Sequence, residues 1–156
     1  MKSQDNVLEK VKDYTASITV SVSPREAFNS INNVTKWWTE ELTGQSQKLN
    51  DEFTVRFFDD VHVSTQRLVE LIPDNKIVWL VTDSKLNFIK DKSEWTNTKI
   101  SFEISNHDNQ TQINFTHIGL GPQVECFNDC SKGWDHYFKG SLFKLLTEGK
   151  GMPELK

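Results

Sequence analysis

The residues of this chain that could carry out chemistry are few and lie far apart. His117 follows Ile113 and Phe115 in an alternating pattern, so its imidazole is expected to point inward from a strand. A half-buried histidine can bond to a neighbouring hydroxyl or carbonyl group as part of the core, or it can serve in binding or proton transfer. Both interpretations of His117 stay open.

The two cysteines, Cys126 and Cys130, are four residues apart on a predicted helix and are therefore neighbours on one flank of it. A metal pair, a redox pair and simple packing are the three possible uses. Zinc needs about two more ligands, and no CxxC or HxxxH pattern supplies them. We predict that both cysteines are reduced thiols, with Cys130 packing as a small hydrophobic residue, and we expect no metal or cofactor.

Other polar groups carry weaker signals. Asp59, Asp60 and His62 could suggest a metal corner, but two acids in a hairpin turn are ordinary turn residues. His136 falls on the helix face opposite Trp134 and is expected in solvent. The sequence contains no glycine-rich phosphate loop, no nucleophile elbow and no HExxH motif, so catalysis has no positive signal.

The aromatic residues are the better indication of function. The chain has five Trp and ten Phe, and such rigid side chains can wall a pocket as well as fill a core. We predict an apolar cavity in which Tyr137 and His117 are polar tips that orient a ligand. The predicted cavity-lining residues are Trp38, Phe57, Trp79, Phe88, Trp95, His117, Cys130, Trp134 and Tyr137.

Composition excludes several classes of protein. At 156 residues the chain fits one domain, which we expect over residues 13–152 after a flexible leader at residues 1–12. The net charge of −4 and the absence of a Lys/Arg cluster argue against nucleic acid as a partner. No apolar run is long enough for a membrane span, and the polar first twelve residues do not resemble a signal peptide. With reduced cysteines, this favours the cytoplasm.

The first elements are easy to place. Alternation from Tyr14 to Val22 predicts a strand, and Ser23-Pro24-Arg25-Glu26 predicts a capped helix from Pro24 to about Asn32. Residues 34–41 predict a second short helical turn containing Trp37 and Trp38. Because neighbours on a helix cannot point the same way, at most one of these two Trp is expected to face the interior fully.

The middle of the chain predicts an antiparallel meander, because short polar turns separate alternating segments. The predicted strands cover residues 52–58, 61–71, 77–81, 99–105 and 112–119. Residues 83–96 lack periodicity but hold Leu86, Phe88, Ile89 and Trp95. We expect a packed loop there that covers a binding site.

From Pro122 to about Gly149 the apolar period becomes helical, with Phe127, Trp134, Phe138, Ser141 and Leu145 on one face. A sheet with one apolar face must be covered, and only this helix is long enough to cover it. We therefore predict an α+β, helix-grip fold: a curved antiparallel β-sheet wrapped around a long C-terminal helix, with two short helices after the first strand.

Several segments also resemble a known family. The strand Tyr14–Ser23 running into Pro24–Phe28, then Asn33–Trp38, Phe115-Thr116-His117 and Gly133-Trp134, resembles the activator of heat-shock-protein ATPase homologue family of the START-like (SRPBCC) superfamily. The resemblance covers roughly residues 14–150. It implies a START-like fold with a central cavity for apolar molecules.

The leading functional interpretation is binding of a small hydrophobic or lipid-like molecule between the sheet and the C-terminal helix. A first alternative is a protein-interaction module or chaperone cofactor, which the family resemblance suggests. Those cofactors carry a separate N-terminal domain, which residues 1–12 are too short to form, so we expect this alternative to be the weaker one. A second is a cyclase- or hydrolase-type enzyme that uses His117 in the same cavity.

Overall fold

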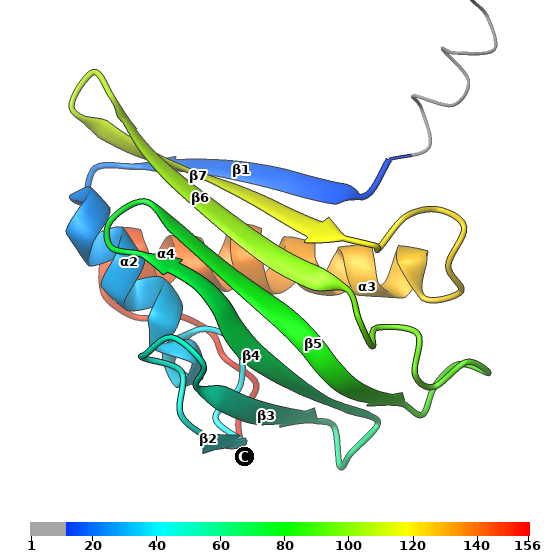
Figure 1. Ribbon diagram of the computed structural model, residues 1–156. Coiled ribbons are helices and arrows are strands. Elements are labelled where there is room, and N and C mark those ends of the chain that lie inside the picture. Colours follow the sequence, from blue (N-terminus) through cyan, green and yellow to red (C-terminus); the bar gives the residue numbers. More distant parts are fainter. Residues whose placement is uncertain (1–11) are drawn as a thin grey trace, which may run out of the picture.

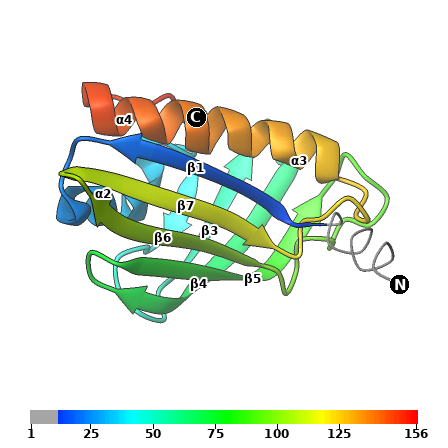
Figure 2. The same ribbon diagram turned by 90° about the horizontal axis from the view of Figure 1, so that it is seen from above.

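One seven-stranded antiparallel sheet forms the body of the protein and curves around a C-terminal helix (Figure 1). The computed structural model describes residues 12–156, so most of the predicted leader lies outside the described residues. The strand order is β1-β7-β6-β5-β4-β3-β2. Seen from above, the helical layer lies along one face of the sheet (Figure 2). This confirms the predicted α+β, helix-grip-like architecture.

The sheet consists of strands β1 (Tyr14–Val20), β2 (Leu42–Gly44), β3 (Glu52–Phe57), β4 (His62–Ile72), β5 (Lys76–Leu86), β6 (Lys99–His107) and β7 (Gln110–Ile118). The helical elements are α2 (Pro24–Asn32), the 3-10 turn η1 (Val34–Lys36), α3 (Phe127–Trp134), the π-helix η2 (Asp135–Leu142) and α4 (Phe143–Glu148). The last three are continuous and form the long C-terminal helix.

Helix α2 begins as its sequence predicts. The Ser23 hydroxyl accepts a hydrogen bond from the Glu26 N–H at 3.1 Å, and Pro24 occupies the first helical position. Ala27 and Ile31 then turn toward the core. The cap thus orients the amphipathic face of the helix against the sheet.

The prediction that only one of Trp37 and Trp38 is interior was wrong. The chain leaves the 3-10 turn at Trp37, where φ is −138° and ψ is −23°, so helical spacing no longer governs the two side chains. Their exposures are 0% and 2%, respectively. The Trp37 indole donates a hydrogen bond to the Ile31 carbonyl at 3.1 Å, which satisfies its buried N–H.

Strands β4 and β5 belong to the predicted meander, but the end of β5 and the buried face of β4 differ from the prediction. Residues 83–86 belong to β5, not to a loop. On β4 the buried side chains include Ser64, Gln66 and Leu68, whereas Val63 and Val69 are only half-buried. Register shifts at Thr65/Gln66 and Leu68/Glu70 accompany this arrangement. A polar patch therefore lies on the inner face of the sheet, where the sequence pattern does not indicate one.

The C-terminal helix begins at Phe127, not at Pro122, and its central segment is a π-helix. The π segment changes the residue spacing, so Tyr137, Leu142 and Leu146 are buried while Leu145 is half-buried. Phe127, the first residue of the helix, is half-buried as well. The predicted stop is confirmed: Gly149 caps the helix with a left-handed φ of 83°.

After Gly149 the chain folds back beside the segment that follows η1. The Glu154 N–H donates to the Trp38 carbonyl at 2.9 Å, and the Glu40 N–H donates to the Glu154 carbonyl at 2.8 Å. Figure 1 shows this last segment, in red, ending next to β2. The turn back brings Glu154 within reach of Tyr137 on the helix.

Candidate functional site

A cavity of about 250 Å³ opens at the end of the sheet where α3 begins. The β3–β4 turn, the β5–β6 loop and helix α3 surround it, so segments distant in sequence form one site. Its lining residues are Trp38, Phe57, Phe58, Val61, His62, Phe88, Trp95, Asp129, Cys130, Gly133, Trp134 and Tyr137. Phe58, Phe88 and Val61 are 58%, 40% and 39% exposed, which leaves an apolar rim at the mouth.

The inner wall is a stack of tryptophans. Trp134 stacks on Trp95 with ring centroids 5.9 Å apart and planes at 12°, and on Trp38 at 5.0 Å and 27°. Trp38 stacks in turn on Trp79 at 5.7 Å, and Trp37 lies against both. All five Trp of the chain thus form one cluster, and three of them face the cavity.

The structure brings most of the predicted residues together. Seven of the nine line the cavity: Trp38, Phe57, Phe88, Trp95, Cys130, Trp134 and Tyr137. Trp79 and His117 do not line it; both are fully buried, Trp79 as an inner member of the tryptophan stack and His117 next to Trp134. Whether any of the nine binds a ligand stays a prediction.

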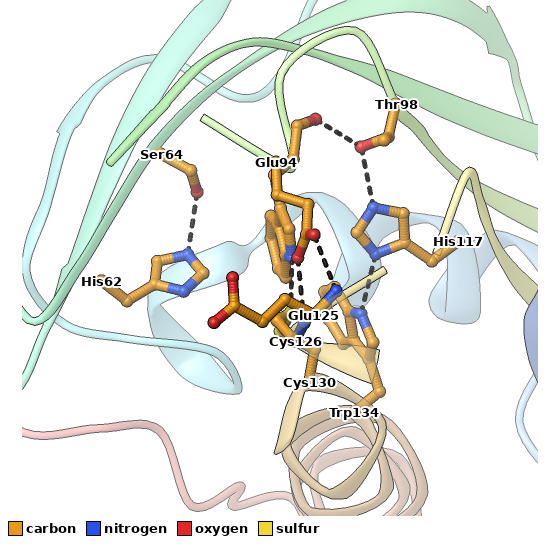
Figure 3. Close-up of a disulfide and its surroundings, with 10 residues drawn as sticks. His62, Ser64, Glu94, Thr98, His117, Glu125, Cys126, Cys130 and Trp134 are labelled. Atoms are coloured by element: carbon orange, nitrogen blue, oxygen red, sulfur yellow. Dashed lines mark hydrogen bonds between the residues drawn. A yellow bond between two sulfur atoms is a disulfide. The ribbon is translucent and has the colours of Figure 1, made fainter. Parts of the chain in front are cut away.

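Both ring nitrogens of His117 have partners in the core (Figure 3). The Trp134 indole donates to Nδ1 at 3.0 Å, and Nε2 lies 2.9 Å from the Thr98 hydroxyl. Because the Thr98 hydroxyl donates to the Trp95 carbonyl at 2.6 Å, it must accept from Nε2–H. The ring is therefore neutral, and burial lowers the pKa of His117 to about 3.

His62 is a polar residue of the cavity that the sequence did not indicate, because together with Asp59 and Asp60 it fits the pattern of a hairpin turn. It begins β4 and turns inward, where its ring meets the Trp95 ring edge-on at 4.6 Å. Nε2 lies 3.1 Å from the Ser64 hydroxyl, which also accepts from the Gln66 amide at 2.6 Å. The Ser64 hydroxyl thus joins the side chains of His62 and Gln66 in one hydrogen-bonded group. Burial lowers the pKa of His62 to about 3.

The prediction of two reduced cysteines was wrong, because Cys126 and Cys130 form a disulfide. Cys126 precedes the first residue of α3 and Cys130 lies in its first turn, which sets their Cα atoms 5.6 Å apart. Cys126 is fully buried, and the Trp95 indole donates to its sulfur at 3.4 Å. Cys130 is 8% exposed and borders the cavity.

Two glutamates clamp the β5–β6 loop to the start of α3. The Glu94 carboxylate accepts from the N–H groups of Glu125 and Cys126 at 2.7 and 2.9 Å. The Glu125 carboxylate accepts from the Lys90 N–H at 3.1 Å and the Asp91 N–H at 3.3 Å. These reciprocal bonds fix the position of Trp95, and hence of one cavity wall.

Over residues 12–156, no group of three or more His, Cys, Asp and Glu side chains is arranged to hold a metal ion. Nor does any helix in that range have the length and apolar character needed to cross a membrane. The site is thus an apolar cavity with His62 and Asp129 as its ionisable side chains besides Tyr137.

Fold and site together define an α+β, helix-grip-like protein with a cavity at one end of its helix. The comparison with solved structures agrees. The Aha1 dimer from Colwellia psychrerythraea is similar over 89% of this chain and 98% of its own, with 23% identity and a TM-score of 0.72. A protein from Staphylococcus saprophyticus covers 92% and 98%, with 13% identity and a TM-score of 0.67.

A protein from Rhizobium loti is similar over 81% of this chain and 91% of its own, with 15% identity and a TM-score of 0.66. At these identities the likeness establishes the fold, and it confirms the structural resemblance inferred from residues 14–150. No family model matches the chain, and no curated protein matches it in sequence.

Proposed function

We propose that the protein binds a small hydrophobic molecule in the cavity beside α3. The observation that carries this proposal is a hollow walled by Trp38, Trp95 and Trp134, with exposed Phe58 and Phe88 at its mouth. Exposed aromatic side chains around a concave apolar site are typical of ligand binding.

The size and polarity of the cavity narrow the ligand class. At about 250 Å³ it is smaller than the roughly 300–1,000 Å³ typical of sites for drug-sized ligands. A compact, flat molecule that stacks on Trp134 suits this space better than a two-chain lipid does. The His62 ring would offer the ligand a hydrogen-bonding partner, and Asp129 would face a donor or a cation.

Native mass spectrometry of protein purified from its own host, followed by titration of small aromatic compounds, tests this proposal. Quenching of tryptophan fluorescence reports occupancy, because three of the five Trp line the cavity. Gly133 lines the cavity and a Cβ added there would meet no atom within 4 Å, so the side chain of Gly133→Leu should occupy cavity space and abolish binding. Gly140→Ala, in the same helix but outside the cavity lining, is the matched control. No co-purifying molecule and no saturable quenching would refute the proposal.

A second candidate is a protein-interaction module of the chaperone-cofactor kind. The likeness to the Aha1 dimer favours it, and the exposed Phe58, Val61 and Phe88 could contact a protein surface. A pull-down with the heat-shock chaperone, together with its ATP turnover, checks this candidate. Binding that survives Gly133→Leu but is lost in Phe58→Asp would favour it over the ligand proposal.

An enzyme of the cyclase or hydrolase type has less support. His117, its expected base, uses both ring nitrogens inside the core. Retained activity of a His117→Gln variant on any substrate found would separate that residue from catalysis.

The cytoplasm stays our proposed location, although the paired cysteines remove one argument for it. Disulfides of cytosolic proteins are usually transient and redox-active rather than structural. Alkylation of cysteines in intact cells before lysis would report which state prevails.

A further inference from the structure

We propose that the Cys126–Cys130 disulfide is a thiol-exchange site that a low-molecular-weight thiol reaches through the cavity. The inference uses the same cavity as the proposed function but does not depend on the identity of its ligand. It assigns a chemical role to the one covalent cross-link of the described residues.

Burial decides which sulfur can be attacked. Cys126 has no exposed surface and lies under the Trp95 indole, whereas Cys130 is 8% exposed and forms part of the cavity wall. Thiol–disulfide exchange requires direct contact of the attacking sulfur with a disulfide sulfur, so access selects the target. A thiol that enters the cavity therefore meets Cys130.

The surroundings also favour Cys126 as the leaving group. The Trp95 indole N–H points at the Cys126 sulfur from 3.4 Å and would stabilise the negative charge that develops there. The Glu94 carboxylate already accepts from the Cys126 N–H at the start of α3, so stabilisation of the Cys126 thiolate rests on the Trp95 N–H. Figure 3 shows the pair next to Glu94, whose carboxylate holds the Cys126 N–H.

The exchange takes two steps. The thiolate of the small thiol bonds to the Cys130 sulfur, the Cys126–Cys130 bond breaks, and Cys126 takes the electron pair and then a proton. A second thiol attacks the external sulfur of this mixed disulfide and releases Cys130 as a thiol. Two external thiols are thereby oxidised to one disulfide, and the protein disulfide is reduced to two thiols.

This geometry couples the redox state to occupancy of the cavity. A mixed disulfide on Cys130 places the remainder of the small thiol in the cavity, beside Trp134 and Gly133. A molecule already bound there blocks the approach to Cys130. Ligand and thiol therefore exclude one another. At equilibrium, each lowers the binding affinity of the other by the same factor.

The test measures reduction of the folded protein by 2-mercaptoethanol, followed by alkylation and mass spectrometry. Filling the cavity with Gly133→Leu should slow reduction at least about tenfold, because access to the sulfur limits the rate. Gly140→Ala raises the helix propensity of the same helix outside the cavity lining, where its Cβ would lie 3.7 Å from the nearest atom, and should stay within about twofold of the wild type. Equal rates for Gly133→Leu and wild type would overturn the proposal.

Single-cysteine variants identify the target sulfur independently. In Cys126→Ser the free Cys130 should form a mixed disulfide with 2-hydroxyethyl disulfide, whereas in Cys130→Ser the buried Cys126 should resist it. The reverse order of reactivity would also overturn the proposal. Circular dichroism of each variant verifies the fold. A failed ligand search with slowed reduction in Gly133→Leu would refute the proposed function and leave this inference standing.

Discussion

Trp134 donates its indole hydrogen to Nδ1 of His117 across 3.0 Å, so this bond joins a residue of the cavity wall to a residue of the core. Trp134 lines the cavity, while its N–H is bonded to His117, which does not line it (Figure 3). His117 is thereby held behind the stack as a neutral ring between Trp134 and Thr98. His117 was predicted to line the cavity, but it lies behind the cavity wall and fixes the orientation of Trp134.

Trp134→Phe should lower the free energy of unfolding by about 2–4 kcal/mol, because it leaves His117 Nδ1 unpaired and removes buried ring volume. Urea denaturation followed by circular dichroism measures the change. Trp38→Phe is the control. It removes a similar ring volume, but the Trp38 indole makes no hydrogen bond within residues 12–156. Equal losses for the two variants would show that the Trp134–His117 bond contributes nothing.

Acid should destabilise the protein through its buried histidines. The pKa of His117 is lowered from 6.5 to about 3 by burial, so the unfolded chain binds a proton that the folded protein does not. Stability is full above pH 6.5 and is lost as the pH falls toward 3, by up to about 1.4 kcal/mol per pH unit.

Urea denaturation between about pH 5 and pH 7 measures this slope. His117→Gln should reduce the slope by about half, because it leaves the contribution of His62, whose pKa burial also lowers to about 3. A His117→Gln variant with the wild-type slope would contradict the assignment.

Removing either Glu94 or Glu125 should weaken the contact between the β5–β6 loop and α3 locally, without unfolding the protein. Glu94→Ala frees the N–H groups of Glu125 and Cys126, as loss of a helix cap does, and should cost about 0.5–2 kcal/mol. Hydrogen exchange should quicken at those two amides. The matched variant, Glu125→Ala, should instead expose the amides of Lys90 and Asp91; the same exchange pattern in both variants would argue against two separate clamps.

Neither tyrosine should ionise while the protein is folded. Burial, followed by the hydrogen bond to Asp135, raises the pKa of Tyr14; burial, followed by Glu154, raises the pKa of Tyr137. Because the raised pKa favours the protonated folded state, stability is lost as the pH rises above about 10.

Spectrophotometric titration should show tyrosinate only as the protein unfolds, with both tyrosines appearing together. Tyr14→Phe should halve the amplitude without restoring an ordinary titration near pH 10. Tyrosinate that forms while the circular dichroism is still native would refute the prediction.

Much of the fold follows from local pattern. Alternation over residues 14–22, the Ser23 cap and the Gly149 stop are short-range signals, and each predicts its element correctly. The order of the elements then leaves one helix to cover one sheet, which predicts the architecture. The errors lie where spacing changes without a local signal, as at Trp37 and in the π segment.

The cavity depended on contacts that no short pattern contains. Amino-acid types alone indicated an aromatic site and named seven of its lining residues, because large apolar rings must gather away from water. The curvature of the sheet and the register shifts of β4 decided that His62 turns inward. The packing of Trp134 decided that His117 lies in the core, and the approach of the β5–β6 loop to α3 placed Cys130 at the surface of the cavity. Each of these is a long-range contact, and only the folded chain brings its partners together.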